Sequence, residues 1–451
     1  MSAGLKPYPA YGDSGTEWLG EIPAHWNAQQ LGRFGGFFKG NGGTKGDEIP
    51  EGVPCIRYGD IYTQYQFFVQ ASRSCVSADR AHDYTPIRYG DVLFAASGET
   101  LEEIGKSVVN LIRSRACCGG DVIVFRPSID VAARFMGYAT DCHRAAFQKS
   151  RMGRGITVMH LYGSQLKYMW IALPPLDEQA TIADFLDRET EKIDALVAKK
   201  QRLIELLQEK RTALISHAVT KGLDPDVPTK DCGSSWWGAA PAHWSASKLG
   251  RVAASQGGMT PDKGKSEYWQ EGTIPWVSPK DLKVEMLLDS EDHVTELGLR
   301  DTGLRLIAPP AVLVVVRGMI LAHSFPVTTI CVPVTINQDL KALTAREGCS
   351  PRYLHRLLQG TRRLMLSYVD DAAHGTKRVR TELWRNAPVF LPPAAEQAEL
   401  CKRLDGMERH LVELESRVQL ALERLLEYRS GLVTAAVTGQ IDVRTYRREA
   451  S

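Results

Sequence analysis

The chain has no apolar run long enough to cross a membrane, and its start lacks the apolar core of a secretory signal. It also has little excess charge, because 55 basic residues are balanced by 53 acidic ones and the formal net charge is only +2. Overall charge therefore does not indicate a nucleic-acid binder, and any basic surface must be local. These absences predict a cytoplasmic protein that binds no membrane.

The sequence also lacks the residue spacings that are typical of metal sites and disulfide frameworks. The nine cysteines are odd in number and form no Cys-x-x-Cys pair, and the eleven histidines show no metal spacing. The sequence therefore predicts reduced thiols and no metal site. The rest of the composition is that of a folded protein, since 43% of the residues are hydrophobic and 24% are charged. That is enough for two or three domains with sizeable cores.

What the chain does contain is a long internal repeat. The segment Asp13–Trp26 returns 218 residues later at Asp231–Trp244, with eight of its fourteen positions identical. The same offset relates Leu173–Gln179 to Leu391–Gln397, and weaker matches follow in order along both halves. The sequence therefore predicts two copies of about 215 residues that cover nearly the whole chain.

Each copy combines a mixed part with a helical part. The mixed part has short apolar runs broken by Gly and Pro beside helical patterns, which is typical of an α/β (α+β) domain. After Pro175 the chain then runs for over forty residues without Gly or Pro, until Gly222. Prolines before and glycine after are helix start and stop signals, so a long helix is expected in each copy.

Both helices repeat apolar residues every seven positions, which is the pattern of a coiled coil. One core position is predicted at Leu186, Ile193, Lys200, Leu207 and Leu214, and at Leu404, Leu411, Val418, Leu425 and Leu432. The other is predicted at Ile182, Glu189, Leu196, Leu203 and Lys210, and at Leu400, Met407, Leu414, Ala421 and Tyr428. Because the two seams are unequal, they favour pairing with each other. We expect an antiparallel pair and an internal pseudo-two-fold repeat; trimers, or helices that dock elsewhere, remain alternatives.

The predicted boundaries follow from these patterns. The expected parts are a first domain, a first long helix, a linker with the second domain, a second long helix and a C-terminal tail. They cover residues 1–172, 173–221, 222–390, 391–438 and 439–451.

Several segments carry a family resemblance. The repeated Asp13–Trp26 phrase, the helix entry "LPPLDEQATIADFLDRETEKIDAL", "ALISHAVTKGLD" and the linker "GLDPDVPTKDCG" resemble the specificity subunit of type I restriction–modification systems. The segment from Gly257 resembles the start of a target-recognition domain of that family, and "LPPAAEQ" with its helix resembles the second spacer. The helix entries and the Trp-Leu-Gly phrase are fairly specific, whereas the domain interiors are not.

The resemblance implies a division of labour. Each recognition domain reads one half of a bipartite, asymmetric double-stranded DNA target, and the helices set a fixed gap between the halves. It implies two adenine methyltransferase subunits and ATP-dependent restriction subunits as partners. S-adenosylmethionine, ATP and Mg²⁺ would be bound by those partners and none by this chain, which would be non-catalytic.

Catalytic motifs in the chain itself are weak. The three Pro-Pro pairs are not preceded by Asn or Asp, so no adenine methyltransferase motif is present. A phosphate loop near Ser97 fails because the required glycine is Thr100. Asp262, Asp281 and Lys283 match a short magnesium-nuclease pattern, which is frequent by chance and lacks a lysine in the first copy.

Basic, glycine-containing loops recur in both copies and are the predicted DNA contacts. Glycine permits close approach of the backbone to phosphates, and Arg and Lys supply the charge. The predicted residues are Lys39, Lys45, Lys149, Arg151 and Arg154 in the first copy, and Lys263, Lys265, Lys377, Arg378 and Arg380 in the second. For each of them the alternative is an ordinary solvated loop charge.

Three function classes therefore follow from the sequence. The first is a non-catalytic DNA-specificity subunit. The second is a scaffold whose two domains bind proteins across a rigid spacer. The third, a stand-alone nuclease, depends on the pattern at Asp262, Asp281 and Lys283.

Overall fold

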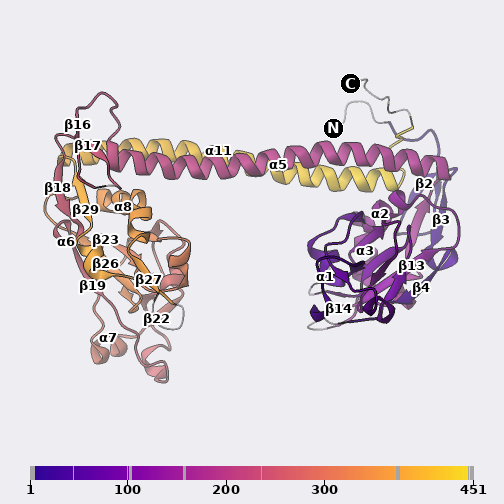
Figure 1. Ribbon diagram of the computed structural model, residues 1–451, viewed down its shortest axis with the longest axis horizontal. Helices are drawn as coiled ribbons and strands as arrows, with labels where there is room; N and C mark the ends of the chain where they lie inside the picture. Colours follow the sequence, from indigo (N-terminus) through magenta and orange to yellow (C-terminus); the bar gives the residue numbers. More distant parts are fainter. Residues whose placement is uncertain are drawn as a thin grey trace. The chain divides into compact units, whose positions relative to one another are not determined.

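The computed structural model describes residues 6–43, 45–98, 100, 104–155, 159–234, 236–371, 376–444 and 446; the side chain of residue 45 is not described. The chain divides into two compact units (Figure 1). Unit 1 comprises Met1–Gln201 and Leu420–Ser451, and unit 2 comprises Arg202–Gln419. No helix in the described part of the chain is both long and apolar enough to span a membrane.

Unit 1 is built on a five-stranded sheet and a four-stranded sheet. The larger sheet has the order β4 (Gly35–Lys39), β13 (Val122–Pro127), β9 (Val92–Ala95), β11 (Ser107–Asn110) and β6 (Phe67–Val69). The smaller has the order β7 (Cys75–Val76), β5 (Val53–Ile56), β12 (Ala116–Cys118) and β8 (Thr85–Ile87). The other strands are β1 (Tyr11–Asp13), β2 (Glu21–Pro23), β3 (Asn27–Gln30), β10 (Ser97–Gly98), β14 (Met159–His160) and β15 (Trp170–Leu173). The helices of this domain are α1 (Tyr58–Thr63), α2 (Ala133–Asp141), α3 (His143–Met152) and α4 (Gly163–Leu166).

Unit 2 repeats this plan. Its five-stranded sheet has the order β19 (Ala253–Gly257), β26 (Leu340–Ala345), β23 (Ala311–Val315), β24 (Val327–Ile330) and β21 (Met286–Leu287). A three-stranded sheet has the order β22 (Asp292–Val294), β20 (Ile274–Val277) and β25 (Thr335–Ile336). The other strands are β16 (Thr229–Asp231), β17 (Ala239–Pro241), β18 (Ser245–Lys248), β27 (Val369–Asp371), β28 (Lys377–Val379) and β29 (Pro388–Leu391). The helices of this domain are α6 (Leu249–Val252), α7 (Glu296–Thr302), α8 (Pro351–Gly360), α9 (Arg362–Leu366) and α10 (Thr381–Arg385).

The two five-stranded sheets match strand for strand. In both, the last pair is parallel, β11 with β6 in unit 1 and β24 with β21 in unit 2, and the other pairs are antiparallel. In the smaller sheets β5 with β12 and β20 with β25 are likewise parallel. The internal repeat predicted from the sequence is therefore confirmed at the level of strand order and direction.

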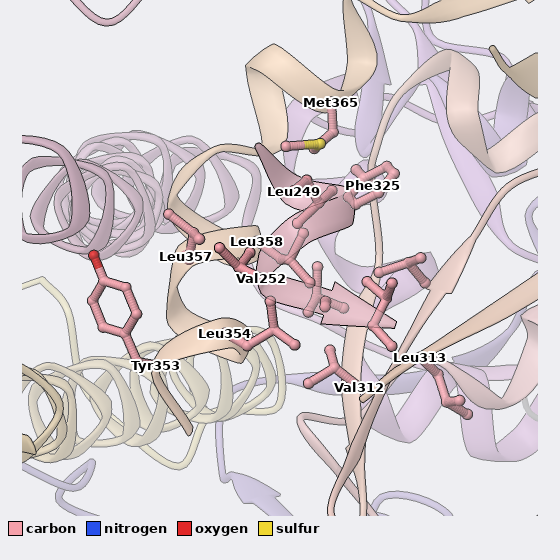
Figure 2. Packing of buried hydrophobic residues seen from close by; sticks show 14 of the residues in the cluster. Leu249, Val252, Val312, Leu313, Phe325, Tyr353, Leu354, Leu357, Leu358 and Met365 are labelled. Carbon is pink, nitrogen blue, oxygen red and sulfur yellow. The ribbon is translucent and has the colours of Figure 1, made fainter. Parts of the chain in front are cut away.

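The core of unit 2 lies between its five-stranded sheet and α8. Figure 2 shows Leu354 and Leu358 of α8 on the side of Val312 and Leu313 of β23, and Leu357 on the side of Tyr353; all of these side chains are buried. The helix begins where the sequence provides a cap, because the side chain of Ser350 accepts a hydrogen bond from the Tyr353 amide and Pro351 follows it. Burial of each such leucine stabilises the fold by about 1.5–3 kcal/mol.

Two long helices, α5 (Leu176–Lys221) and α11 (Ala394–Val437), each belong partly to both units. Within unit 2 they run antiparallel, because Gln208 donates to Glu415 at 2.6 Å while Arg211, further along α5, donates to Glu408, earlier in α11, at 2.7 Å. Within unit 1, Arg429 of α11 donates to both carboxylate oxygens of Asp194 of α5. The predicted pair of long antiparallel helices is confirmed.

One of the two predicted core positions is wrong over most of the length of the helices. The first set is correct, since Leu186, Ile193, Leu404, Leu411 and Leu432 are buried. In the second set Ile182 and Leu400, near the starts of the helices, are buried as predicted, whereas Leu196, Leu203, Met407 and Tyr428 are 39–46% exposed. The buried positions are instead Thr190, Ala218, Glu408, Leu422, Arg429 and Ala436. The exposed leucines of the second set made the predicted register more apolar than the register that is actually buried. Charged residues can lie in the buried seam because Arg429 pairs with Asp194 and Glu408 pairs with Arg211.

The repeated His-Trp phrase anchors each domain to its own helix entry. In unit 1, His25 and Trp26 contact the Glu178 carboxylate of α5 at 2.8 and 3.2 Å, and the Tyr8 hydroxyl donates to it at 2.7 Å.

In unit 2, His243 and Trp244 contact Glu396 of α11 at 2.7 and 3.0 Å. The next residue of each helix, Gln179 or Gln397, hydrogen-bonds the backbone just before α2 or α8. These segments therefore pack against the long helices, and their function is structural.

Candidate nucleic-acid interface

Each domain has a hollow beside its five-stranded sheet. In unit 1 the hollow has a volume of about 640 Å³ and lies among β4, the start of β13, the β10–β14 pair and α4. Its polar lining residues are Lys39, Ser97, Asp121, His160, Tyr162, Ser164 and Lys167. Phe37 and Phe38 of β4 add aromatic surface. The unit 1 hollow is therefore a mixed polar and aromatic surface with two lysines.

The hollow of unit 2, of about 620 Å³, lies at the equivalent place. It lies among the end of β23, the start of β26, β28 and α10. Its cationic lining residues are Arg317, Lys341, Arg378 and Arg380, and Gln338, Thr381 and Glu382 are its other polar residues. The unit 2 hollow is therefore the more basic of the two.

A glycine-containing loop leaves the same edge strand next to each hollow. A Cβ atom at Gly40, after β4, would collide with the Gly119 carbonyl oxygen, and one at Gly258, after β19, would collide with the Ile336 carbonyl oxygen. Only glycine lets the loop backbone approach the neighbouring segment so closely. In unit 2 the loop is also tied to the hollow, because the Thr260 hydroxyl donates to the side chain of Gln338.

The strand pair at each hollow places two side chains directly opposite each other. In unit 1 these are Ser97 of β10 and His160 of β14, joined by a hydrogen bond of 3.1 Å between Oγ and Nδ1. In unit 2 an antiparallel bridge places Arg317 opposite Arg378. Directly opposed residues of an antiparallel pair project from the same face, so both side chains of each pair face together.

The predicted contacts of unit 1 fall in several places. Lys39 is exposed and lines the hollow, whereas the side chain of Lys45 lies outside the described residues. Arg151, near the end of α3, and Arg154 are exposed, and the backbone of Arg154 pairs with that of His160. Three of these five predicted side chains are therefore available to a ligand.

Lys149 requires a correction. Its side chain is 1% exposed, and its Nζ atom donates to Asp141 and to the Thr140 carbonyl oxygen, both at 2.9 Å. The Ser107 hydroxyl lies 3.4 Å from the same ammonium. A buried, fully paired ammonium cannot reach a phosphate, so Lys149 belongs to the core of unit 1 and not to a binding surface.

The predicted contacts of unit 2 differ in their partners. Lys263 and Lys265 are exposed in the loop after β19, and the hydrogen bond from Lys265 to the Tyr268 hydroxyl raises the pKa of Lys265. Arg378 and Arg380 line the hollow, and Lys377 adjoins it. Lys377 is paired with Asp371 at 2.5 Å and Arg380 with Asp370 at 3.0 Å.

The basic residues near residues 149–154 and 377–380 are not structural equivalents. β28 occupies the place of β14, so Lys377, Arg378 and Arg380 correspond to Met159, His160 and Tyr162.

The sequence did not indicate three further basic residues that line the hollows. Arg317, after β23, and Lys341, in β26, line the hollow of unit 2, and Lys167, after α4, lines that of unit 1. None of the three lies in a glycine-rich loop. Lys167 has an equivalent in the exposed Arg385 of α10, because Gly32 contacts Lys167 as Gly250 contacts Arg385. The available signal was the position of Arg317 directly after the apolar run of β23, which corresponds to Ser97 after β9.

The carboxylates of the nuclease pattern have structural functions. Asp262 accepts from the Gly264 amide at 2.9 Å within its own loop. Asp281 accepts from the Ser278 amide and hydroxyl at 2.8 and 3.0 Å, and caps the turn Pro279–Asp281. Among the described residues no group of three His, Cys, Asp or Glu side chains is placed to hold a metal ion.

Comparison with known families identifies the fold that carries these hollows. The sequence profile described as the type I restriction modification DNA specificity domain matches residues 50–206 and 241–424, which is more than half of the chain and one segment in each copy. The chain belongs to this family. The resemblance noted in the sequence is therefore confirmed, and the chain is a type I restriction–modification specificity subunit with two DNA specificity domains.

Curated members of the specificity-subunit family are similar over different lengths. The EcoR124I/EcoR124II specificity subunit of Escherichia coli is 30% identical over 160 residues, which cover 36% of this chain and 40% of that protein. Less than two thirds of its length is thus matched. A putative MjaX specificity subunit of Methanocaldococcus jannaschii is 21% identical over 436 residues, covering 95% of this chain and 96% of that protein.

Two solved structures share the fold. A chain from a study of complex assembly and conformational transition in the type I R-M system aligns with a TM-score of 0.67 and 16% identity, covering 92% of this chain and 98% of that one. The HsdS subunit from Thermoanaerobacter tengcongensis aligns with a TM-score of 0.51 and 16% identity, covering 93% and 98%. At this identity the likeness supports the fold alone.

Proposed function

We propose that this specificity subunit reads a bipartite, asymmetric double-stranded DNA target, one half with each domain. The observation that carries the proposal is the pair of hollows. They lie at equivalent places in two copies of one fold, and each is bordered by a glycine-bearing basic loop. Because the side chains that line the two hollows differ, the two half-sites should differ as well.

Exposed cations around the hollows supply the phosphate contacts in this proposal. They are Lys39, Arg151, Arg154 and Lys167 in unit 1, and Lys263, Lys265, Arg380 and Arg385 in unit 2, with the half-buried Lys377 beside Arg378. Lys45 remains a predicted contact without a described side chain. Phosphate contacts position a protein on the duplex and make its affinity depend on salt, whereas contacts to base edges supply the sequence preference.

The long helices have two functions in the proposal. Their continuous length fixes the number of base pairs between the half-sites, and their surfaces dock two adenine methyltransferase subunits, with ATP-dependent restriction subunits joining the complex. Exposed apolar side chains on α5 and α11 support such docking because they are costly to leave in water; they include Leu196, Leu206, Met407, Leu420 and Leu426.

We further propose that the chain itself performs no chemistry and acts in the cytoplasm. The carboxylates of the nuclease pattern are occupied by backbone capping, and the sequence lacks a methyltransferase motif. S-adenosylmethionine, ATP and Mg²⁺ would therefore act at the partner subunits, and this chain would determine where on the DNA they act.

Selection from a pool of random duplexes tests the proposal. The full chain is mixed with the pool, bound duplexes are separated on a gel, and the enriched sequences are read. We expect one motif in two parts with a constant gap. A protein scaffold would enrich no motif, and cleavage of the pool by the chain alone in the presence of magnesium would favour the nuclease alternative.

A further inference from the structure

The opposed arginines of unit 2 lie in the floor of its hollow. Arg317 follows β23 and Arg378 is the central residue of β28. Backbone hydrogen bonds flank the pair on both sides, from Gly318 N to the Lys377 oxygen and from Val379 N to the Val316 oxygen, each at 2.9 Å. The two arginine side chains thus leave the same face of a hydrogen-bonded backbone, and Lys341 of β26 lines the same hollow.

This arrangement places two like charges on one face of paired strands. Like charges directly opposite each other on paired strands destabilise a sheet. Neither Arg317 nor Arg378 has an acidic partner among the described residues, and both are exposed. The neighbouring cations Lys377 and Arg380 are both neutralised, by Asp371 and Asp370. A ligand with paired acceptor atoms would relieve the repulsion between the two arginines.

Comparison of the two copies indicates which acceptor atoms these are. A phosphate is the same in every sequence, so residues that contact it need not change between the copies. The loops after β4 and β19 both carry lysine, Lys45 in one copy and Lys263 and Lys265 in the other, and Lys167 corresponds to Arg385.

The opposed pair, in contrast, changes its chemistry completely while its backbone geometry is preserved. It is Ser97 with His160 in one copy and Arg317 with Arg378 in the other. A position that reads bases has to change when the two half-sites differ.

We propose that Arg317 and Arg378 are the specificity-determining residues of the second domain and that they read guanine in its half-site. Guanine presents O6 and N7 as two acceptors in the major groove, and a guanidinium donates to both at once. Lys341 adds positive charge behind the pair. This inference rests on the proposed DNA recognition and deepens it, because it assigns a base to one domain.

The test compares three forms of the full chain by selection from random duplexes: the natural sequence, the double variant Arg317→Ala with Arg378→Ala, and the charge-preserving variant Arg317→Lys with Arg378→Lys. We expect the natural chain to require guanine in one half of its motif. Both variants should lose the preference for that guanine by roughly 5- to 150-fold and keep the other half of the motif unchanged. Lysine cannot reproduce the two-pronged contact although it keeps the charge.

Three results would overturn the inference. One is a motif that is unchanged in both variants. Another is a uniform loss of affinity in the alanine variant that the lysine variant restores, with a salt dependence about one unit shallower per lost contact, which would indicate phosphate contacts. The last is a natural motif without guanine in either half. If the natural chain enriches no motif at all, the proposed function itself fails, so the two failures are distinguishable.

Both substituted side chains are exposed, so folding should be unaffected. Circular dichroism and the thermal transition of each variant verify this. The double variant Ser97→Ala with His160→Ala is the matched control in unit 1, and we expect it to alter the opposite half of the motif.

Discussion

At the strand pair beside its hollow, unit 1 places Ser97 opposite His160, whereas unit 2 places Arg317 opposite Arg378. At the helix entries the two units do not differ in this way, because Glu178 and Glu396 both accept hydrogen bonds from a His-Trp pair. The duplicated chain thus keeps the contacts that hold a domain on its helix and changes the contacts at the hollow. At these two places the shared contacts are structural, and the divergent pair lies at the proposed recognition surface.

The cores of the two units also differ at equivalent places, and the largest predicted effect comes from this difference. Lys149 is buried against Asp141 in unit 1, and its equivalent in unit 2 is the exposed Ser367. Lys149→Ala leaves the Asp141 carboxylate without its partner, so we expect unit 1 to lose about 3–5 kcal/mol of unfolding free energy. Ser367→Ala should change unit 2 by less than about 0.5 kcal/mol.

Hydrogen exchange resolved by peptide under denaturant measures each unit separately, which matters because the two units need not unfold together. Equal destabilisation by the two variants would contradict this reading of the two cores.

Acid should affect unit 2 more than unit 1 through one histidine. Burial, with Arg356 and Arg362 nearby, lowers the pKa of His355 to about 4, and its Nδ1 lies 2.8 Å from the Thr329 hydroxyl. The unfolded chain takes up a proton near pH 6.5 and the folded one only near 4. The stability of unit 2 should therefore fall between these values as pH decreases, by about 3 kcal/mol.

Unit 1 has Gly137 at the position equivalent to His355, and glycine has no side chain that could make its stability depend on pH. Denaturant titrations from pH 7 to pH 4 check the prediction. The variant His355→Gln should remove this part of the pH slope of unit 2 while leaving that of unit 1 unchanged, and a slope that survives the substitution would have another origin.

The helix anchors should differ in strength although their design is shared. The Glu178 side chain is 5% exposed and forms hydrogen bonds with Tyr8, His25 and Trp26. The Glu396 side chain is 31% exposed and, among the described residues, forms hydrogen bonds only with His243 and Trp244. Glu178→Ala leaves buried donors unsatisfied, so we expect a loss of about 2–3 kcal/mol in unit 1, against about 1 kcal/mol for Glu396→Ala in unit 2. The urea midpoint of each unit, measured by hydrogen exchange for both variants, tests this prediction. A larger loss for Glu396→Ala than for Glu178→Ala would refute it.

The smallest effects should be found at two exposed lysines near the basic loops. Lys39→Ala removes a lysine at the end of β4 that lines the unit 1 hollow, and Lys263→Ala removes one from the loop after β19. Each should leave stability within about 0.5 kcal/mol and make the dependence of DNA affinity on salt shallower by about one unit. Titrations at several salt concentrations provide the slopes. A change of base preference in either variant would mean that the loop reads sequence rather than phosphate.

Much of the fold could be predicted because the sequence contains an internal repeat. The repeated phrases and the forty-residue stretch without Gly or Pro identified two copies and two helices. The register of the seam could not be obtained in the same way, because Arg429 and Glu408 are buried only by virtue of ion-pair partners on the opposite helix. Hydrophobicity alone selected Leu196 and Leu203, which face solvent.

The candidate site shows the same limit. Loop composition located Lys39, Arg378 and Arg380, which line the hollows. It failed at Lys149, which is buried through contacts with Asp141 on the preceding helix and Ser107 on a strand. It also could not find Arg317, because the significance of that residue comes from the strand 61 residues later that places Arg378 opposite it. Such pairings are properties of the sheet and not of local sequence.

The most direct test of the central claim is a map of modified adenines in the DNA of cells that express this chain with the methyltransferase proposed as its partner. Two forms should be compared, the natural chain and one in which the first domain is replaced by that of another family member. We expect a two-part motif with a constant gap, in which the replacement changes one half only. A single continuous motif, or a replacement that changes both halves together, would contradict the assignment of one half-site to each domain.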